Sequence, residues 1–252
     1  MSINEPSKSL REAYRKAVLD QIQTISQSQT GSISQAGKLL SETLLNNRWI
    51  FTFGTGHSHM LAEELFYRAG GLTNIRPILI PELMLHVSAS ESTEAERDLA
   101  WVDRIFGSYP MAKGDVLIIA SNSGRNHVPV ELAKRAQEQN LSVIVLINRQ
   151  HANIYSSRHP SGNKTSDYAD VVLDNGGIPG DAVLDIPTAN IRCGATSTIT
   201  GTLLLQLVIC EAIEQAIAKG WKPALFQSSN AGGDEANEKL ITKLTEAGIR
   251  HL

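Results

Sequence analysis

Apolar residues recur at helical spacing through the first part of the chain. Leu10, Tyr14 and Val18 are each four residues apart, which places them on one face of a helix. Residues 8–47 are therefore predicted to be helical. A weaker pattern around Gly31 predicts a break, after which a second helix follows.

Beyond this helical part, short apolar runs alternate with helical patterns, which is typical of strands buried on both faces of a parallel sheet. The runs lie at 49–53, 75–80, 116–120, 143–147 and 171–173, with a weaker one at 183–186. The helical patterns between them lie at 57–69, 93–106 and 127–139. The alternation predicts an α/β three-layer sandwich, in which a five-stranded parallel sheet is flanked by helices. Right-handed crossovers favour the flavodoxin-like strand order 2-1-3-4-5.

Two more helices are predicted to close the chain, at 196–219 and 233–247. Residues 148–168 form a long polar segment, and such segments are usually functional lids or mobile tips. No internal linker interrupts the rest of the sequence. We therefore expect residues 1–47 to be an N-terminal helical extension and residues 48–252 to be a single compact unit.

Charge, hydropathy and cysteine content argue against several classes of protein. The chain has 252 residues, and its 23 Lys and Arg against 26 Asp and Glu give a net charge of -3, which argues against a nucleic-acid-binding protein. No apolar run approaches the roughly 18–20 residues of a membrane span, and the polar N-terminus does not resemble a signal peptide. The two cysteines form no CxxC pair, which excludes a disulfide scaffold and a zinc ribbon. We expect a cytoplasmic protein that acts on a small molecule, without a nucleic-acid or membrane partner.

Polar turns that contain glycine follow the first and third predicted strands. Residues 54–59 read GTGHSH and residues 121–126 read SNSGRN, and each turn leads into a helix. In the expected strand order these two strands flank the point where the order reverses, so both turns face one crevice. Glycines allow a ligand to approach the backbone, hydroxyls donate hydrogen bonds, and helix N-termini offer free N–H groups. The two turns therefore predict a phosphate site.

The turns match neither common nucleotide-binding motif. His59 stands where GxGxxG requires its third glycine, and the chain has no Gly-Lys-Ser/Thr, so NAD and nucleoside triphosphates are poor candidate ligands. The alternative is that these serines and glycines only cap helices and form turns. The predicted phosphate-binding residues of the two turns are Gly56, His57, Ser58, Ser121, Asn122, Ser123, Gly124, Arg125 and Asn126.

A third hydroxyl-rich segment opens the predicted helix at 196–219. Residues 194–202 read GATSTITGT, which is more hydroxyl groups than one helix N-cap needs. Thr196, Ser197 and Thr198 are therefore added to the candidate phosphate-binding set. The alternative is that they satisfy only the first turn of the helix and the solvent.

These three motifs, in this order, resemble the sugar isomerase (SIS) domain family. The resemblance extends from about Arg48 to Ala218 and is greatest to an uncharacterised branch that is sometimes labelled phosphoheptose isomerase. It implies that the serine-rich turns hold the phosphate of a phosphosugar. It also implies an aldose–ketose isomerase that works through an enediol, although a noncatalytic phosphosugar sensor and a lyase or etherase on the same scaffold remain alternatives.

Isomerisation through an enediol needs a base and a proton shuttle, which carboxylates and imidazoles provide. The resemblance favours Glu63 or Glu64, one to two helical turns after the first phosphate turn, as the base. His59 is close to the predicted phosphate, and His86 follows the second strand at the same edge of the sheet. For each of these side chains, a solvated helix face or ordinary packing is the alternative. His159 and Lys164, in the polar segment, are further candidates for contact with an anionic substrate.

No cofactor and no metal are expected. His59 and Glu63, four residues apart, are two ligands on one helix face and do not complete a metal site. The zinc site of phosphoheptose isomerases has a Gln and a His on the late helix, whereas no His occurs here between Ile191 and Gly220. The resemblance, together with many apolar residues on the first and late helices, predicts a homodimer or homotetramer.

Overall fold

The computed structural model describes residues 9–246, which begin with two consecutive helices. These are α1 (Leu10–Ser28) and α2 (Thr30–Leu45), and the break between them falls at Gln29, two residues before the predicted position. Helix α2 packs along α8 (Ser197–Ala218), and the two cross closely at Gly37. A Cβ atom on this glycine would lie 2.4 Å from Cγ of Glu211, so the helices can approach this far only because Gly37 has no side chain.

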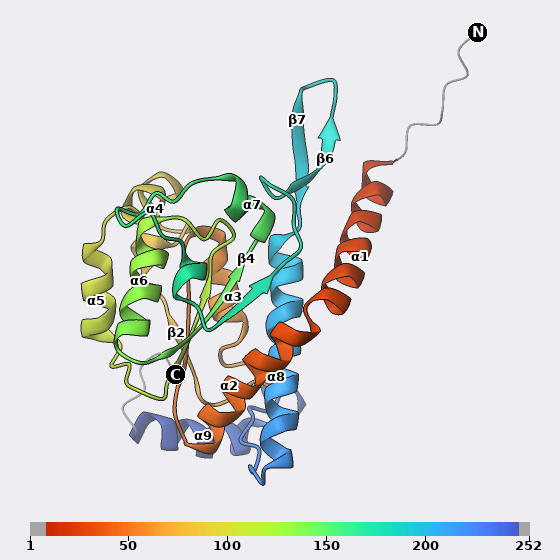
Figure 1. The fold of residues 1–252 in the computed structure, drawn as a ribbon. Helices are drawn as coiled ribbons and strands as arrows, with labels where there is room; N and C mark the ends of the chain where they lie inside the picture. The colour runs from red at the N-terminus through yellow and green to blue at the C-terminus, as the bar shows by residue number, and fades with distance from the viewer. Residues whose placement is uncertain (1–8, 247–252) are drawn as a thin grey trace.

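The central sheet has the predicted architecture (Figure 1). Five parallel strands lie in the order β2-β1-β3-β4-β5. Their bounds are β1 (Ile50–Gly54), β2 (Ile75–Ile78), β3 (Val116–Ala120), β4 (Ser142–Ile147) and β5 (Val171–Asp174). The α/β fold and the order 2-1-3-4-5 are therefore confirmed. All five residues of β1 and of β3 are buried, as expected for strands covered on both faces.

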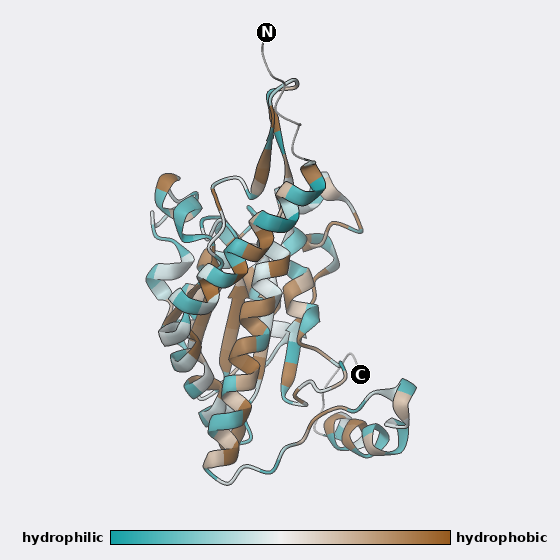
Figure 2. Cartoon of the chain, turned by 90° about the vertical axis from the view of Figure 1, so that its right-hand side faces the viewer, coloured by the Kyte–Doolittle hydropathy of each residue, from teal (hydrophilic) through white to brown (hydrophobic). Residues whose placement is uncertain are grey.

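Side chains alternate between the two faces of the sheet and form two separate apolar clusters. Ile50 and Ile118 point into one cluster, which also contains buried residues of α2, α3 (His59–Glu64) and α8. Phe51 and Leu117 point into the other, with α5 (Ala100–Ser108) and α6 (His127–Glu138). In Figure 2 the strands between these layers are largely brown, the colour of apolar residues. Because α2 shares a core with the sheet, the division of the chain after residue 47 stays a prediction.

Two of the predicted helices are shorter than their sequence patterns. The pattern at 57–69 contains the single 3₁₀ turn η1 (Gly56–Ser58) and α3. The pattern at 93–106 divides into α4 (Ala89–Ala95) and α5. At the division, Oδ1 of Asp98 accepts a hydrogen bond of 2.9 Å from the N–H of Ala100, the first residue of α5, and so satisfies one of the free N–H groups in its first turn.

Two segments differ more from the sequence prediction. The polar segment at 148–168 contains α7 (Arg149–Ile154) and η3 (Thr165–Tyr168) rather than loop alone. The weak apolar run at 183–186 is β6 (Ala182–Ile186), which pairs antiparallel with β7 (Ile191–Ala195) in a hairpin separate from the central sheet. The hairpin projects beyond the sheet beside α1 (Figure 1), and the Tyr14 hydroxyl donates a 2.5 Å hydrogen bond to the carbonyl of Ala195.

The remaining elements are two 3₁₀ turns and the last helix. They are η2 (Pro81–Leu83), η4 (Ser229–Ala231) and α9 (Asp234–Glu246). The predicted end of the last helix, at residue 247, lies outside the described residues.

Helix α8 is long and apolar enough to cross a membrane by length and composition, which the sequence prediction did not anticipate. One such helix is weak evidence, because the core helix of a water-soluble protein passes the same test. Leu204, Leu205 and Val208 on α8 are nearly or fully buried in the cluster beneath the sheet. This packing accounts for their apolar character without a membrane.

If α2 is part of the folding unit, Leu40→Ala should lower the free energy of unfolding by about 2–5 kcal/mol, because it leaves a cavity beside the sheet. Leu40 is fully buried, whereas Leu19 on α1 is 50% exposed and supplies the control variant Leu19→Ala. Urea denaturation measures both. Equal, small losses for the two variants would show that α2 does not contribute to the core.

Candidate functional site

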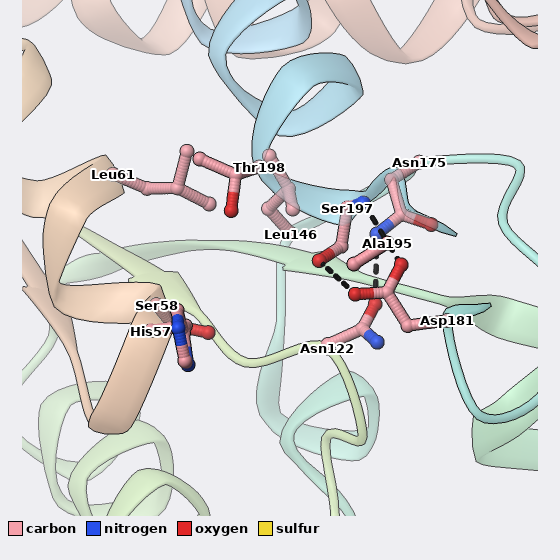
Figure 3. Close-up of a pocket in the computed structure, with 10 residues that line it drawn as sticks. All are labelled: His57, Ser58, Leu61, Asn122, Leu146, Asn175, Asp181, Ala195, Ser197 and Thr198. Carbon is pink, nitrogen blue, oxygen red and sulfur yellow. Dashed lines mark hydrogen bonds between the residues drawn. The ribbon is translucent and has the colours of Figure 1, made fainter. Parts of the chain in front are cut away.

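A pocket of about 200 Å³ lies at the carboxyl ends of β1, β3 and β4 (Figure 3). It lies where the strand order reverses, which is the usual ligand position in an open α/β sheet. All three hydroxyl-rich segments contribute to its wall. The lining residues are His57, Ser58, Leu61, Asn122, Leu146, Asn175, Asp181, Ala195, Ser197 and Thr198.

The first turn brings His57 and Ser58 to the pocket. A Cβ atom on Gly54 would lie 2.2 Å from the carbonyl oxygen of Ser58, so the chain can fold back here only at a glycine. Gly56 follows with φ +54°, a left-handed conformation that also favours glycine. The Ser58 hydroxyl makes no hydrogen bond within residues 9–246, and it is therefore free for a ligand.

In the second turn, Ser121 shapes the backbone and Asn122 faces the pocket. Ser121 is buried, and its Oγ accepts a 3.2 Å hydrogen bond from the N–H of Gly124. The side chain of Asn122 is held in place because its Oδ1 accepts a 2.8 Å hydrogen bond from Nδ2 of Asn175, which also lines the pocket. Ser123 is half-buried, and neither its hydroxyl nor its N–H is bonded to another described residue. Ser123 therefore offers two free donors.

In the third segment a carboxylate already occupies the N-terminus of α8. Oδ1 of Asp181 accepts hydrogen bonds from the N–H groups of Thr196 (3.1 Å) and Ser197 (2.9 Å). Its Oδ2 accepts a 2.6 Å hydrogen bond from the Ser197 hydroxyl, as Figure 3 shows. Thr196 is fully buried. Of the three predicted residues, Thr198 alone lines the pocket with a hydroxyl that is unbonded within the described chain.

The four predicted proton-transfer residues lie outside the pocket lining. The ring of His59 is held by its own turn through Nδ1 and the carbonyl of Gly56, and its Nε2 is 3.7 Å from Glu63. Glu64 forms an ion pair with Arg68 and accepts a 3.2 Å hydrogen bond from Gln206.

Glu63 and His86 are both exposed to solvent. The side chain of Glu63 retains 53% of its accessible surface. The ring of His86 lies 6.3 Å from that of His59. Within residues 9–246, no three His, Cys, Asp or Glu side chains are arranged to hold a metal ion.

His159 and Lys164 lie outside the pocket lining, and their contact with a substrate stays a prediction. His159 is buried, with Nε2 3.1 Å from Oε2 of Glu131, and Lys164 donates to the carbonyl of Ala152. Burial lowers the pKa of His159, although Glu131 opposes that shift. These contacts hold the segment between β4 and β5 in place.

Glu96 joins the two polar turns, and no sequence motif singles it out. Its carboxylate accepts hydrogen bonds from the Thr55 hydroxyl, after β1, and from Nδ2 of Asn126, after β3 (2.6 Å). Burial raises the pKa of Glu96, although these two hydrogen bonds and the nearby Arg158 oppose the shift. Glu96 is a positioning residue, because it fixes one turn relative to the other.

Sequence comparisons give relatives along nearly the whole chain. A UPF0309 protein of Listeria innocua is 40% identical over 226 residues, which cover 89% of this chain and 92% of the relative. A UPF0309 protein of Caldanaerobacter subterraneus subsp. tengcongensis is 40% identical over 245 residues, which cover 96% of this chain and 99% of the relative.

Solved structures share the fold at low sequence identity. A phosphoheptose isomerase from Francisella tularensis has a TM-score of 0.52 at 14% identity, and the match covers 84% of this chain and 98% of that one. The Vibrio vulnificus NanR protein complexed with ManNAc-6P has a TM-score of 0.53 at 16% identity, covering 94% of this chain and 70% of that one.

The family model for the SIS domain matches residues 13–148, which is more than half of the chain. This match includes the first and second polar turns and the strands that position them. The chain belongs to the SIS domain family.

Proposed function

We propose that the pocket binds a phosphosugar and that the protein interconverts its aldose and ketose forms through an enediol. The observation that carries this proposal is the convergence of unbonded donors from three distant segments on one cavity. Three donors of the lining make no hydrogen bond within residues 9–246: the hydroxyl of Ser58 after β1, Nδ2 of Asn122 after β3 and the hydroxyl of Thr198 at the start of α8. A packed core would not leave three such donors unpaired around one opening.

The phosphate binds between the 121–126 turn and the first turn. The hydroxyls of Ser58 and Thr198 supply its donors from the pocket lining, and Ser123, which follows Asn122 just outside that lining, adds its free hydroxyl and N–H. The N–H groups of Thr196 and Ser197 and the Ser197 hydroxyl are already bonded to Asp181 and are not available to the phosphate. The carboxylate of Asp181 also repels a phosphate, so it faces the hydroxyl end of the sugar.

Isomerisation requires a base to take a proton from the carbon beside the carbonyl and return it to the former carbonyl carbon. In the described part of the chain, His57 and Asp181 are the titratable residues of the pocket lining. Asp181 is committed to three hydrogen bonds, so His57 is the better placed proton carrier. The assignment of the base to Glu63 or Glu64 stays a prediction and is tested against His57 below.

A noncatalytic sensor is the second candidate function. It is favoured by one observation, the position of Glu63 and Glu64 outside the pocket lining. A lyase or etherase would begin with the same proton abstraction and would then expel a leaving group from the neighbouring carbon.

The wider setting of the protein is part of the same proposal. The protein works in the cytoplasm as a homodimer or homotetramer, without a cofactor, a nucleic acid or a membrane. Self-association is supported by apolar residues left exposed on α8, where Ile199 is 41% and Ile217 49% accessible.

Glucose 6-phosphate, but not glucose, should raise the melting temperature of the protein. Replacing the free donors in Ser123→Ala/Thr198→Ala should weaken its binding by roughly 10²- to 10⁴-fold, because two hydrogen bonds to a charged group are lost and each is worth about 1.5–3 kcal/mol. Ser26→Ala on α1 is the control, and isothermal titration calorimetry measures the affinity. Unchanged affinity in the double variant would place the phosphate elsewhere.

If His57 carries the proton, His57→Gln should lower turnover by about 10²- to 10⁴-fold while binding is retained. Glu63→Gln and Glu64→Gln should then retain most of the turnover. The assay separates aldose and ketose phosphates from a panel of sugars by mass spectrometry coupled to chromatography. Loss of turnover in Glu63→Gln or Glu64→Gln, with turnover retained in His57→Gln, would identify that glutamate as the base. Binding without turnover of any sugar would identify a sensor.

Glu96 should make stability depend on pH. Because its pKa is raised in the folded state, the folded protein binds more protons than the unfolded chain from near the usual Glu pKa of about 4.3 upward. The contribution of Glu96 to stability therefore falls as the pH rises through that window. The variant Glu96→Gln lacks this pH-dependent contribution. Its free energy of unfolding, relative to that of the wild type, should therefore rise between pH 4 and pH 7.

Urea denaturation at several pH values measures this difference. The exposed Glu94→Gln is the control and should show no comparable trend. A difference between Glu96→Gln and wild type that is constant across the range would contradict the raised pKa.

A further inference from the structure

Two arginines beside the second polar turn lack any carboxylate partner. Arg125 belongs to the turn itself, and its carbonyl accepts a 2.9 Å hydrogen bond from the N–H of Arg158. Neither guanidinium lies within 4.0 Å of a carboxylate oxygen in residues 9–246, in contrast to Arg48, which is paired with Asp115. The two arginines are therefore neighbouring cations without a carboxylate partner in the described part of the chain.

The guanidinium of Arg125 is also partly withdrawn from water. Its Nε is fully buried and has no hydrogen-bond partner, while its guanidinium carbon lies 5.4 Å from the ring centre of Tyr155. The ring attracts the cation but leaves the Nε–H unsatisfied. A buried, unpaired donor on a cation costs free energy unless a ligand supplies an acceptor.

The charges of Arg125 and Arg158 both act on His151, which lies beside the pocket. The pKa of His151 is lowered by burial and then by Arg125 and Arg158, while Asp181 of the pocket lining opposes the shift. The Nδ1 of His151 accepts a 3.2 Å hydrogen bond from the N–H of Gly180, the residue before Asp181. The arginine pair lies outside the pocket lining but close to it in the fold, because His151 is bonded beside Asp181 and Arg125 belongs to the turn that carries Asn122.

The negative groups nearby do not neutralise the pair. Asp181 is held at the start of α8 by its three hydrogen bonds and lies more than 4.0 Å from both guanidinium groups. The charge of Arg158 favours the ionised form of Glu96. The carboxylate of Glu96 is, however, bonded to Thr55 and Asn126, and its burial favours the protonated form. Arg158 instead donates a 3.2 Å hydrogen bond to Oδ1 of Asn126, which orients its guanidinium over the turn.

We infer that Arg125 and Arg158 bind a carboxylate of the ligand, so that the substrate is an acidic phosphosugar with a negative group besides its phosphate. A planar guanidinium offers paired donors that match a carboxylate, and such charge-assisted bonds are among the strong ones in proteins. The inference rests on the proposed function, because the phosphate occupies the Ser58, Ser123 and Thr198 donors. It adds a specificity-determining pair for the same site.

The test uses two sugar phosphates that differ at one carbon. Gluconate 6-phosphate carries a carboxylate where glucitol 6-phosphate carries a hydroxymethyl group. Gluconate 6-phosphate should bind the wild-type protein at least about tenfold more tightly in isothermal titration calorimetry. Arg158→Gln should remove most of that preference and change glucitol 6-phosphate binding by less than about twofold, and Arg125→Gln should weaken gluconate 6-phosphate binding by a clearly larger factor than glucitol 6-phosphate binding. The control is Arg149→Gln, an exposed arginine on the adjacent α7, which should keep the preference.

The outcomes separate this inference from the proposed function. Binding of neither phosphate would overturn the phosphosugar site itself. Equal binding of the two would leave the phosphosugar site in place and overturn the second anionic group. An equal loss for both ligands in Arg125→Gln would mean that the arginine binds the phosphate, which also overturns it. Fructose 1,6-bisphosphate against fructose 6-phosphate distinguishes a second phosphate from a carboxylate, and a preference only in that pair would contradict the carboxylate.

Discussion

The candidate site depends on hydrogen-bond donors that the fold leaves unpaired at one edge of a parallel sheet. Parallel strands end at the same edge, and each strand must turn there into a helix whose first N–H groups have no partner in the helix. At β1 and β3 the turns carry glycine and serine, so the backbone stays open and hydroxyls add to the free donors. The third set of donors comes from α8, which packs on the same face of the sheet as α3. The pocket is the place where these three ends meet.

The site combines free hydrogen-bond donors with a carboxylate. At the start of α8 the N–H groups of Thr196 and Ser197 are bonded to Asp181, whereas the hydroxyl and N–H of Ser123 are unbonded within residues 9–246. The pocket lining therefore holds the carboxylate of Asp181 as well as the free hydroxyls of Ser58 and Thr198. A ligand with an anionic end and a hydroxyl-bearing end matches this polarity. Glu96 keeps the two donor turns in register from behind, and its burial makes that link sensitive to pH.

Much of the fold and part of the site could be predicted from sequence. Buried strands such as β3 and β4 are continuous apolar runs, and the chain order of strands and helices restricts the topology. Ser58, Asn122 and Thr198 were found because they follow strands or open a helix. Asp181 and Glu96 could not be predicted in this way, because each lies at a turn or bend and binds partners 15 to 41 residues away in sequence. Glu63 and Glu64 are favoured as bases by the family resemblance, and both side chains lie outside the pocket lining.

The central claim is that free donors from three segments hold one phosphate. A crystal structure of the protein with glucose 6-phosphate tests it most directly. The account predicts phosphate oxygens within about 3.2 Å of the Ser123 N–H or hydroxyl and of the Thr198 hydroxyl, with Asp181 still bonded to Ser197. A phosphate seated at the α8 N-terminus in place of Asp181, or bound outside this pocket, would contradict it.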